Sequence, residues 1–142
     1  YIEEYFRRFP GVKHFMEEQV ENCKKQGFLL TIMGRRRYIN EIHASSYSVR
    51  QLGERLAMNS PIQGSAADII KLAMISVYRR LRKENIPARL ILQVHDELIV
   101  EAPENEVEQV KRILKEEMEQ VVSYSVPLTA EVGTGKTWLE AH

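Results

Sequence analysis

Apolar residues recur at helical spacing in three long stretches of the chain. The first begins after a break at Pro10 and Gly11 and ends at Gly27, a residue suited to the left-handed stop of a helix. The second runs from about 49 to about 85, and Pro61 should start a new helix or kink the old one there. The third runs from 107 to about 124. The apolar positions are Val12, Phe15, Met16, Val20 and Cys23; Ile69, Ile70, Leu72, Ala73, Ile75, Val77 and Leu81; and Val107, Val110, Leu114, Met118 and Val121. Those of the second stretch form a broad stripe that should be buried against a sheet.

Shorter apolar runs and one alternating pattern predict strands. Two short extended pieces should flank a basic turn, and two later runs should form a tight hairpin whose strands are buried on both faces. A final alternating run has the period of a half-buried strand. These runs cover 28–33 and 34–38, 89–94 and 98–100, and 126–132. The order of helix, hairpin, helix and strand is typical of an α+β fold with an antiparallel sheet.

Composition and charge narrow the class of protein. The chain has 142 residues, 44% hydrophobic and 28% charged, with 20 basic and 20 acidic side chains. The zero net charge conceals a drift, because residues 1–60 carry +3, residues 61–102 carry +1 and residues 103–142 carry −4. A polyanion should therefore meet the first two thirds of the chain rather than its acidic tail.

Other features concern the compartment. The single cysteine, Cys23, cannot form an internal disulfide and fits a reducing cytoplasm, where we expect it to be a core residue. Charged residues interrupt every apolar run before it reaches the length of a membrane span, so no membrane partner is expected. The chain starts at Tyr1 without a leader or an initiator Met, within a predicted helix, and we expect it to be cut from something longer.

The polar residues between the two hairpin runs, His95, Asp96 and Glu97, are the strongest chemical signal. Magnesium prefers one or two carboxylates together with phosphate oxygens and waters. Adjacent strand residues point to opposite faces, however, so Asp96 and Glu97 should not chelate one ion without an outside partner. A plain polar turn is the alternative. A metal-dependent phosphohydrolase, with His43 or His14 as a further ligand, is a weaker one because that motif normally lies on helices.

The segment from Gly133 to Thr137 resembles the end of a phosphate-binding loop. The full pattern requires glycine where Ala130 stands and a long helix afterwards, yet only five residues follow Thr137. We therefore expect a C-terminal turn with Trp138 packed back on the core.

Three polar residues, Arg55, Asn59 and Gln63, are spaced by four and would line one face of a continuous helix, with a drift of about 40° per step. Such a ladder could read the acceptors that every base pair offers in the minor groove, testing pair geometry without reading sequence. Alternatively, Ser60, Pro61 and Gln63 form an N-terminal cap and the ladder is a solvated stripe.

The triplet of Arg35, Arg36 and Arg37 could bind phosphates, although a solvated basic turn is the alternative.

Several motifs in one order resemble the C-terminal part of bacterial family A DNA polymerases. They are Gly34-Arg-Arg-Arg-Tyr38, Arg55-Leu-Ala-Met-Asn59-Ser-Pro-Ile-Gln63-Gly-Ser-Ala-Ala-Asp68, Gln93-Val-His95-Asp96-Glu97-Leu and Val132-Gly-Thr-Gly-Lys-Thr-Trp138. The resemblance covers the whole chain. It implies a partial right-hand polymerase, with residues 1–50 in the fingers and residues 51–142 in a palm whose catalytic hairpin is 89–101.

The resemblance also implies DNA-directed DNA synthesis in replication and repair, with primer-template DNA and dNTPs as partners, in the bacterial cytoplasm at the nucleoid. Asp96 matches a catalytic aspartate, Glu97 the neighbouring carboxylate, both metal-binding, and His95 a residue beside the primer end. The cofactor implied is a pair of Mg²⁺ ions, with Mn²⁺ as a substitute. Arg55, Asn59 and Gln63 match residues that contact the minor groove.

Two parts of the family's active site lie upstream in the family and have no counterpart here. They are the first palm strand, which carries the other catalytic aspartate, and the fingers helix that binds the triphosphate. The upstream remainder of the polymerase is therefore an expected partner, and the 142 residues alone are expected to be inactive. The alternative function is a non-catalytic module that binds duplex DNA.

Overall fold

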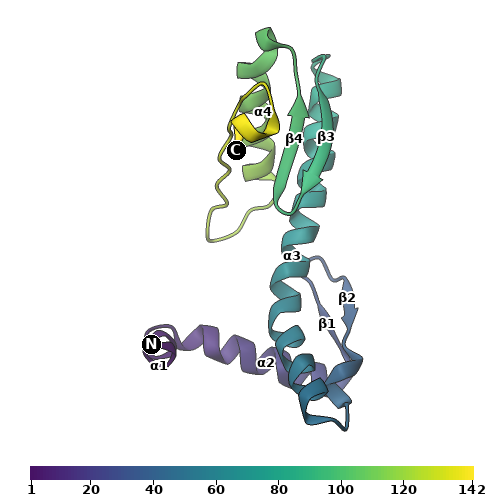
Figure 1. Ribbon diagram of the computed structural model, residues 1–142, viewed down its shortest axis with the longest axis vertical. Coiled ribbons are helices and arrows are strands. Elements are labelled where there is room, and N and C mark those ends of the chain that lie inside the picture. The colour runs from purple at the N-terminus through teal and green to yellow at the C-terminus, as the bar shows by residue number, and fades with distance from the viewer. The chain divides into compact units, whose positions relative to one another are not determined.

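Helices dominate the chain, and a computed structural model describes all 142 residues. The helices are α1 (Ile2–Arg8), α2 (Pro10–Gln26), α3 (Tyr47–Lys83), α4 (Val107–Gln120) and α5 (Trp138–Ala141), with short 3-10 turns η1 (Asn40–His43) and η2 (Glu104–Glu106). The strands are β1 (Phe28–Leu30), β2 (Arg36–Tyr38), β3 (Arg89–Val94) and β4 (Glu97–Glu101) (Figure 1). The chain forms two compact units, Tyr1–Asp68 and Ile69–His142. None of the helices combines the length and apolarity that a membrane span requires.

Local sequence signals set the elements of the first unit. Pro10 occupies the first turn of α2, where its missing N–H is no loss, and Gly27 ends that helix with φ of +78°. Strands β1 and β2 then pair antiparallel, with Phe28 opposite Tyr38 (Figure 1). The predictions of a break at Pro10, a stop at Gly27 and two extended pieces joined by a turn are confirmed. Arg36 and Arg37 lie in β2, however, so the turn holds only Arg35 of the basic triplet.

The core of this unit gathers side chains from α2, β1, η1 and α3. Its buried members are Cys23, Leu29, Ile39, Ile42 and Ala57. Cys23 is fully buried, as predicted, and burial raises the pKa of its thiol. Helix α3 approaches η1 closely at Gly53, where an added Cβ would lie 2.6 Å from the backbone nitrogen of Ile42.

Helix α3 runs through Pro61 as one element, so the prediction of a new helix capped by Ser60 is wrong. A proline inside a helix removes one backbone donor, but packing of the flanking turns can outweigh that cost. Ser60 and Pro61 are buried, and the Ser65 hydroxyl donates to the Pro61 carbonyl over 2.5 Å. Gln63 consequently lies in the helix interior and is not a capping residue.

In the second unit the core lies between the later part of α3, one face of the hairpin and α4. Its buried residues are Val77, Leu81, Ile86, Val110, Ile113 and Leu114, with Leu98 and Val100 of β4 packed against them. The predicted contact between this helix and a sheet is therefore confirmed. Leu72 and Ile75, predicted to be buried, are 39% and 46% exposed because the apolar stripe of α3 is wider than the surface that covers it.

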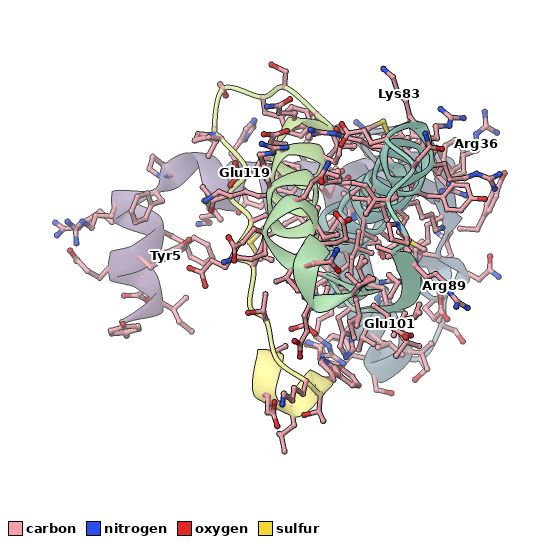
Figure 2. All side chains as sticks on the ribbon, turned by 90° about the horizontal axis from the view of Figure 1, so that it is seen from above. Tyr5, Arg36, Lys83, Arg89, Glu101 and Glu119 are labelled. Atoms are coloured by element: carbon pink, nitrogen blue, oxygen red, sulfur yellow. The ribbon has the colours of Figure 1, made fainter.

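Strands β3 and β4 form an antiparallel hairpin with Arg89 opposite Glu101 and Val94 opposite Glu97. Figure 2 labels Arg89 and Glu101, the pair at the end away from the turn. The register shifts between Leu90 and Leu92. The prediction of a tight hairpin is confirmed, but burial on both faces is wrong. Ile91 and Leu92 are about half exposed, since the sheet has two strands and only one face packs on the helices.

The C-terminal part departs most from expectation. Helix α4 buries Val110 and Leu114 of its predicted stripe, while Val107 and Met118 are only partly buried. It ends at Gln120 rather than near 124, so Val121 lies beyond its last residue. Residues 126–132 form no strand, because no neighbouring strand offers them backbone partners; the Ala130 amide donates instead to the Glu119 carboxylate over 2.9 Å. Trp138 opens α5 and is 48% exposed, so its predicted packing on the core is wrong.

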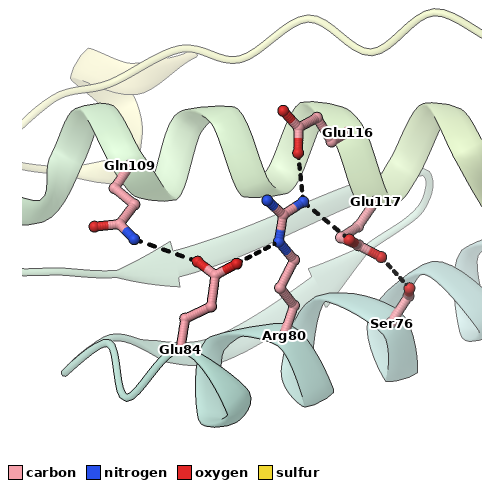
Figure 3. A network of polar contacts seen from close by, with 6 residues as sticks. All are labelled: Ser76, Arg80, Glu84, Gln109, Glu116 and Glu117. Carbon is pink, nitrogen blue, oxygen red and sulfur yellow. Dashed lines mark hydrogen bonds and ion pairs between the residues drawn. The ribbon is translucent and has the colours of Figure 1, made fainter.

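A polar network ties α3 to α4 (Figure 3). The Arg80 guanidinium donates to Glu84 through Nε over 3.0 Å, and its Nη1 donates to Glu116 over 2.5 Å and to Glu117 over 3.0 Å. The Ser76 hydroxyl donates to Glu117 as well. Hydrogen bonds to Glu116 and Glu84 raise the pKa of Arg80, and the bond from Arg80 lowers the pKa of Glu84.

Candidate metal site and nucleic-acid interface

His95 and Asp96 form the two-residue turn of the hairpin, between the paired residues Val94 and Glu97. His95 has φ of +53°, a left-handed conformation in which histidine is enriched among non-glycine residues. The Gln93 side-chain amide donates to the His95 carbonyl over 2.5 Å and so braces the turn. Both turn side chains are exposed, and Asp96 makes no side-chain hydrogen bond or ion pair within the chain. Its carboxylate therefore faces solvent with its oxygens available.

Glu97, by contrast, is the first residue of β4 rather than a turn residue, and it is partly buried. Its Oε1 lies 3.1 Å from Nδ1 of His142. The two neighbouring carboxylates thus have different surroundings, because Asp96 lies in the turn and Glu97 in the strand. His142 was not identified from the sequence, because nothing local links two residues 45 positions apart.

The donor chemistry at the turn suits a hard cation, since magnesium takes oxygen ligands and keeps several waters and phosphate oxygens of its own. One exposed carboxylate, Asp96, meets that requirement in kind. No three His, Cys, Asp or Glu side chains of the structure form a group that could hold a metal ion.

The three polar residues of α3 lie as a ladder requires. Arg55, Asn59 and Gln63 are all exposed, and the helix that carries them is continuous. None of the three side chains makes a hydrogen bond or ion pair within the chain. Because Gln63 is not used as a cap, all three polar ends are available to an outside acceptor.

The arginine triplet divides into three different environments. Arg35 donates from Nε to Asp68 of α3 over 2.8 Å, while its side chain stays 63% exposed. Arg36, which is labelled in Figure 2, lies with its guanidinium 4.8 Å from the centre of the Phe28 ring. This distance is within the range of a cation–π contact. Arg37 is exposed and makes no polar side-chain contact. Sequence reasoning missed Asp68; its one signal was an acidic residue directly before the buried stripe of α3.

A sequence profile of DNA polymerase family A matches residues 1–140. The chain belongs to DNA polymerase family A. DNA polymerase I of Bacillus caldotenax is 52% identical over 141 residues, and the thermostable DNA polymerase I of Thermus aquaticus is 48% identical over 141 residues. These alignments cover 99% of the chain but 16% and 17% of those relatives. The chain thus spans about a sixth of the length of the family A relatives it matches.

A solved family A structure agrees with this membership. The polymerase domain of Pol1 from M. smegmatis, described as a complex with DNA primer-template and dNTP, superposes with a TM-score of 0.94 and 43% sequence identity. The match covers 99% of this chain and 25% of that one. The predicted family and the α+β fold class of a partial polymerase are therefore confirmed.

Proposed function

We propose that this chain is part of a DNA-directed DNA polymerase, with residues 1–50 in the fingers and residues 51–142 in the palm. The observation that carries the proposal is the family A match over residues 1–140, together with an exposed, unpaired Asp96 at the hairpin turn. Because the chain spans about a sixth of its relatives, further catalytic groups must come from the rest of the polymerase. The 142 residues alone should not extend a primer.

The reaction proposed is transfer of a nucleotidyl group from a dNTP to a primer. The primer 3′-hydroxyl oxygen forms a bond to the α-phosphorus of the dNTP, and the bond between that phosphorus and the oxygen that bridges to the β-phosphate breaks. Pyrophosphate leaves, and the hydroxyl proton passes to water. Divalent ions, Mg²⁺ in the first place, stabilise the attacking and leaving oxygens when bound. Asp96 would hold such an ion with its free oxygens, Glu97 would assist from the strand, and His95 would contact the primer end.

The duplex partner is proposed to lie along the exposed ladder of α3. Arg55, Asn59 and Gln63 carry amide and guanidinium donors, which suit the N3 and O2 acceptors that all Watson–Crick pairs present in the minor groove. Arg35 to Arg37 would contact phosphates. The relative from M. smegmatis is described in complex with primer-template and dNTP, which supports the same partners here.

Substitution of Asp96 by Asn in the full-length polymerase tests the catalytic proposal. The change keeps the size of the side chain and removes the charge, so primer extension should be lost while the dissociation constant for duplex DNA stays within about twofold. Glu101→Gln, at the far end of β4, is the matched control and should retain extension. Retained extension by Asp96→Asn would overturn the catalytic assignment and favour a module that only binds duplex DNA.

Substitution of Gln63 by Ala tests the groove contact. Loss of the amide should reduce extension from a matched primer end more than from a mismatched one, because only a matched pair presents its acceptors in the expected place. Arg79→Ala removes an exposed side chain of α3 outside the ladder and should leave this ratio unchanged. An unchanged matched-to-mismatched ratio in Gln63→Ala would show that Gln63 does not read the pair.

A further inference from the structure

Asp68 is a buried carboxylate that the proposed function does not use. It lies in α3, its side chain is 3% exposed, and it accepts hydrogen bonds from the Thr31 hydroxyl and from Arg35 Nε. A charge held this far from water is costly unless it is paired and hydrogen-bonded. Both donors belong to the basic turn, residues 31–35 between β1 and β2, so Asp68 joins that turn to the helix.

The basic turn contacts α3 at a further point. The Ile32 amide donates to the Ser65 hydroxyl over 2.9 Å, and within the turn the Arg35 amide donates to the Thr31 hydroxyl over 3.1 Å. At Gly64 the turn comes so close that an added Cβ would lie 2.6 Å from Thr31 Cγ2. The turn thus packs on α3 at Gly64, Ser65 and Asp68, which follow Gln63 of the ladder.

These contacts determine which part of the Arg35 guanidinium is exposed to solvent. A guanidinium carries five N–H groups in a rigid fork, and the Nε–H of Arg35 points to Asp68 Oδ1. The side chain remains 63% exposed, so the outer end of the fork faces outward. Two parallel N–H groups of that end match the spacing of phosphate oxygens, whereas a lysine in its place would offer one ammonium to one partner at a time.

We propose that Asp68 is a positioning residue of the DNA interface, and that it orients Arg35 so that the outer guanidinium nitrogens bind a phosphate of the duplex. The inference rests on the proposed function, because it assigns a role within the same DNA-binding surface. It differs from simple electrostatics in sign. Removing an acidic residue near DNA ordinarily strengthens binding, whereas loss of the positioning carboxylate should weaken it.

The test measures the dissociation constant of the full-length polymerase for primer-template over a series of salt concentrations. Each phosphate contact makes the slope of the logarithm of the association constant against the logarithm of salt concentration more negative by about 0.9. Loss of one contact should therefore reduce the ratio of the association constants at 0.1 M and 1 M salt by about eightfold. Arg35→Ala and Asp68→Asn should each show this loss, and the double variant should lose no more than either. A steeper or unchanged slope for Asp68→Asn would overturn the proposal.

Arg37→Ala is the matched control, because Arg37 lies in β2 next to the turn, is exposed, and is not one of the two donors to Asp68 described above. Its effect should add to that of Asp68→Asn, as independent phosphate contacts do. If Asp68→Asn does not fold, Arg35→Lys decides: the charge is kept, but one ammonium cannot serve Asp68 and a phosphate together. A wild-type slope in Arg35→Lys would overturn the proposal.

Failure of this inference and failure of the proposed function have different signatures. If Arg37→Ala and Asn59→Ala weaken DNA binding while Asp68→Asn and Arg35→Lys keep the wild-type slope, only the positioning role is wrong. If none of the four substitutions changes the dissociation constant, the surface is not a DNA interface, and the proposed function of this chain in binding duplex DNA fails with it.

Discussion

The packing of the basic turn on α3 can be tested by substitution of Gly64, where a gain in helix propensity competes with a steric clash. Alanine is the better helix former by about 1 kcal/mol, so Gly64→Ala in the interior of α3 should stabilise the chain if nothing else intervened. Its Cβ, however, would lie 2.6 Å from Thr31 Cγ2, whereas ordinary contact starts at 3.4 Å. One of the two groups would have to move by the difference, 0.8 Å.

Thr31 cannot yield by turning its side chain. Rotation about the Cα–Cβ bond would move the methyl group away, but it would also withdraw the hydroxyl from Asp68. Overpacking of this kind costs about 1–3 kcal/mol, which exceeds the gain in helix propensity. We expect a net local destabilisation of about 1 kcal/mol, equal to a roughly fivefold change in an opening equilibrium.

Hydrogen exchange in the full-length polymerase measures this locally. The amides of Ile32 and Arg35 donate to the Ser65 and Thr31 hydroxyls, so both should exchange about fivefold faster in Gly64→Ala. Adding Thr31→Ser removes the methyl group and keeps the hydroxyl. In that background Gly64→Ala should slow exchange instead, because the clash is gone and the propensity gain remains.

Two other glycines serve as controls. Gly11 in α2 has nothing within 4 Å of an added Cβ, so Gly11→Ala should be neutral or stabilising. Gly53 faces the backbone of Glu41 and Ile42, so Gly53→Ala should be the most damaging, and no side-chain change can relieve it. Slower or unchanged exchange in Gly64→Ala alone, or the same sign with and without the Thr31 methyl, would refute the reasoning.

Three further predictions concern stability and reactivity. Ile113→Ala empties a fully buried site and should destabilise the second unit by about 2–5 kcal/mol, measured as faster exchange along α4. Arg80→Met should destabilise the contact between α3 and α4 at pH 7. The pKa of Glu84 is lowered in the folded state, so its ion pair with Arg80 stabilises the folded state fully above the usual glutamate pKa. That stabilisation is lost as the pH falls through the lowered pKa, so the difference in stability between Arg80→Met and wild type should shrink in acid. Burial raises the pKa of Cys23, so iodoacetamide at pH 8 should not modify it until the protein is unfolded.

Much of the fold was predictable because its signals are local. Pro10 at a helix start, Gly27 in a left-handed stop and polar residues between two apolar runs each specify backbone geometry within a few residues. Helical periodicity likewise located the buried side of α4. These features do not depend on what covers them, and the structure confirms them.

The errors arose where a distant partner decides the outcome. Residues 126–132 alternate like a strand, but a strand needs a neighbour with free backbone groups, and alternation carries no information about that neighbour. Burial of Leu72 and Ile75 depended in the same way on the width of the surface opposite. Of the two alternatives predicted at Pro61, the start of a new helix was wrong, because packing along a long helix can outweigh a local preference.

The candidate site shows the same division. The face shared by Arg55, Asn59 and Gln63 followed from spacing alone, and the structure places all three exposed on one continuous helix, although their role in binding DNA stays a prediction. The partners Asp68 and His142 were not predictable. Each is paired with a residue more than 30 positions away, and such pairings leave no trace in local sequence.

The two tasks proposed for segment 63–68 of α3 fall on two sides of the helix. At 100° per residue, Gly64 and Asp68 lie about 40° apart and both face the basic turn, while Gln63 lies about 100° from Gly64 and faces solvent with the ladder. A movement of the turn at Gly64 or Asp68 therefore need not disturb Gln63. Substitutions on the inner side should change the salt dependence of DNA binding and leave discrimination between matched and mismatched ends intact. Substitutions on the outer side should do the reverse, and a variant of either side that changes both would show that the two tasks are coupled.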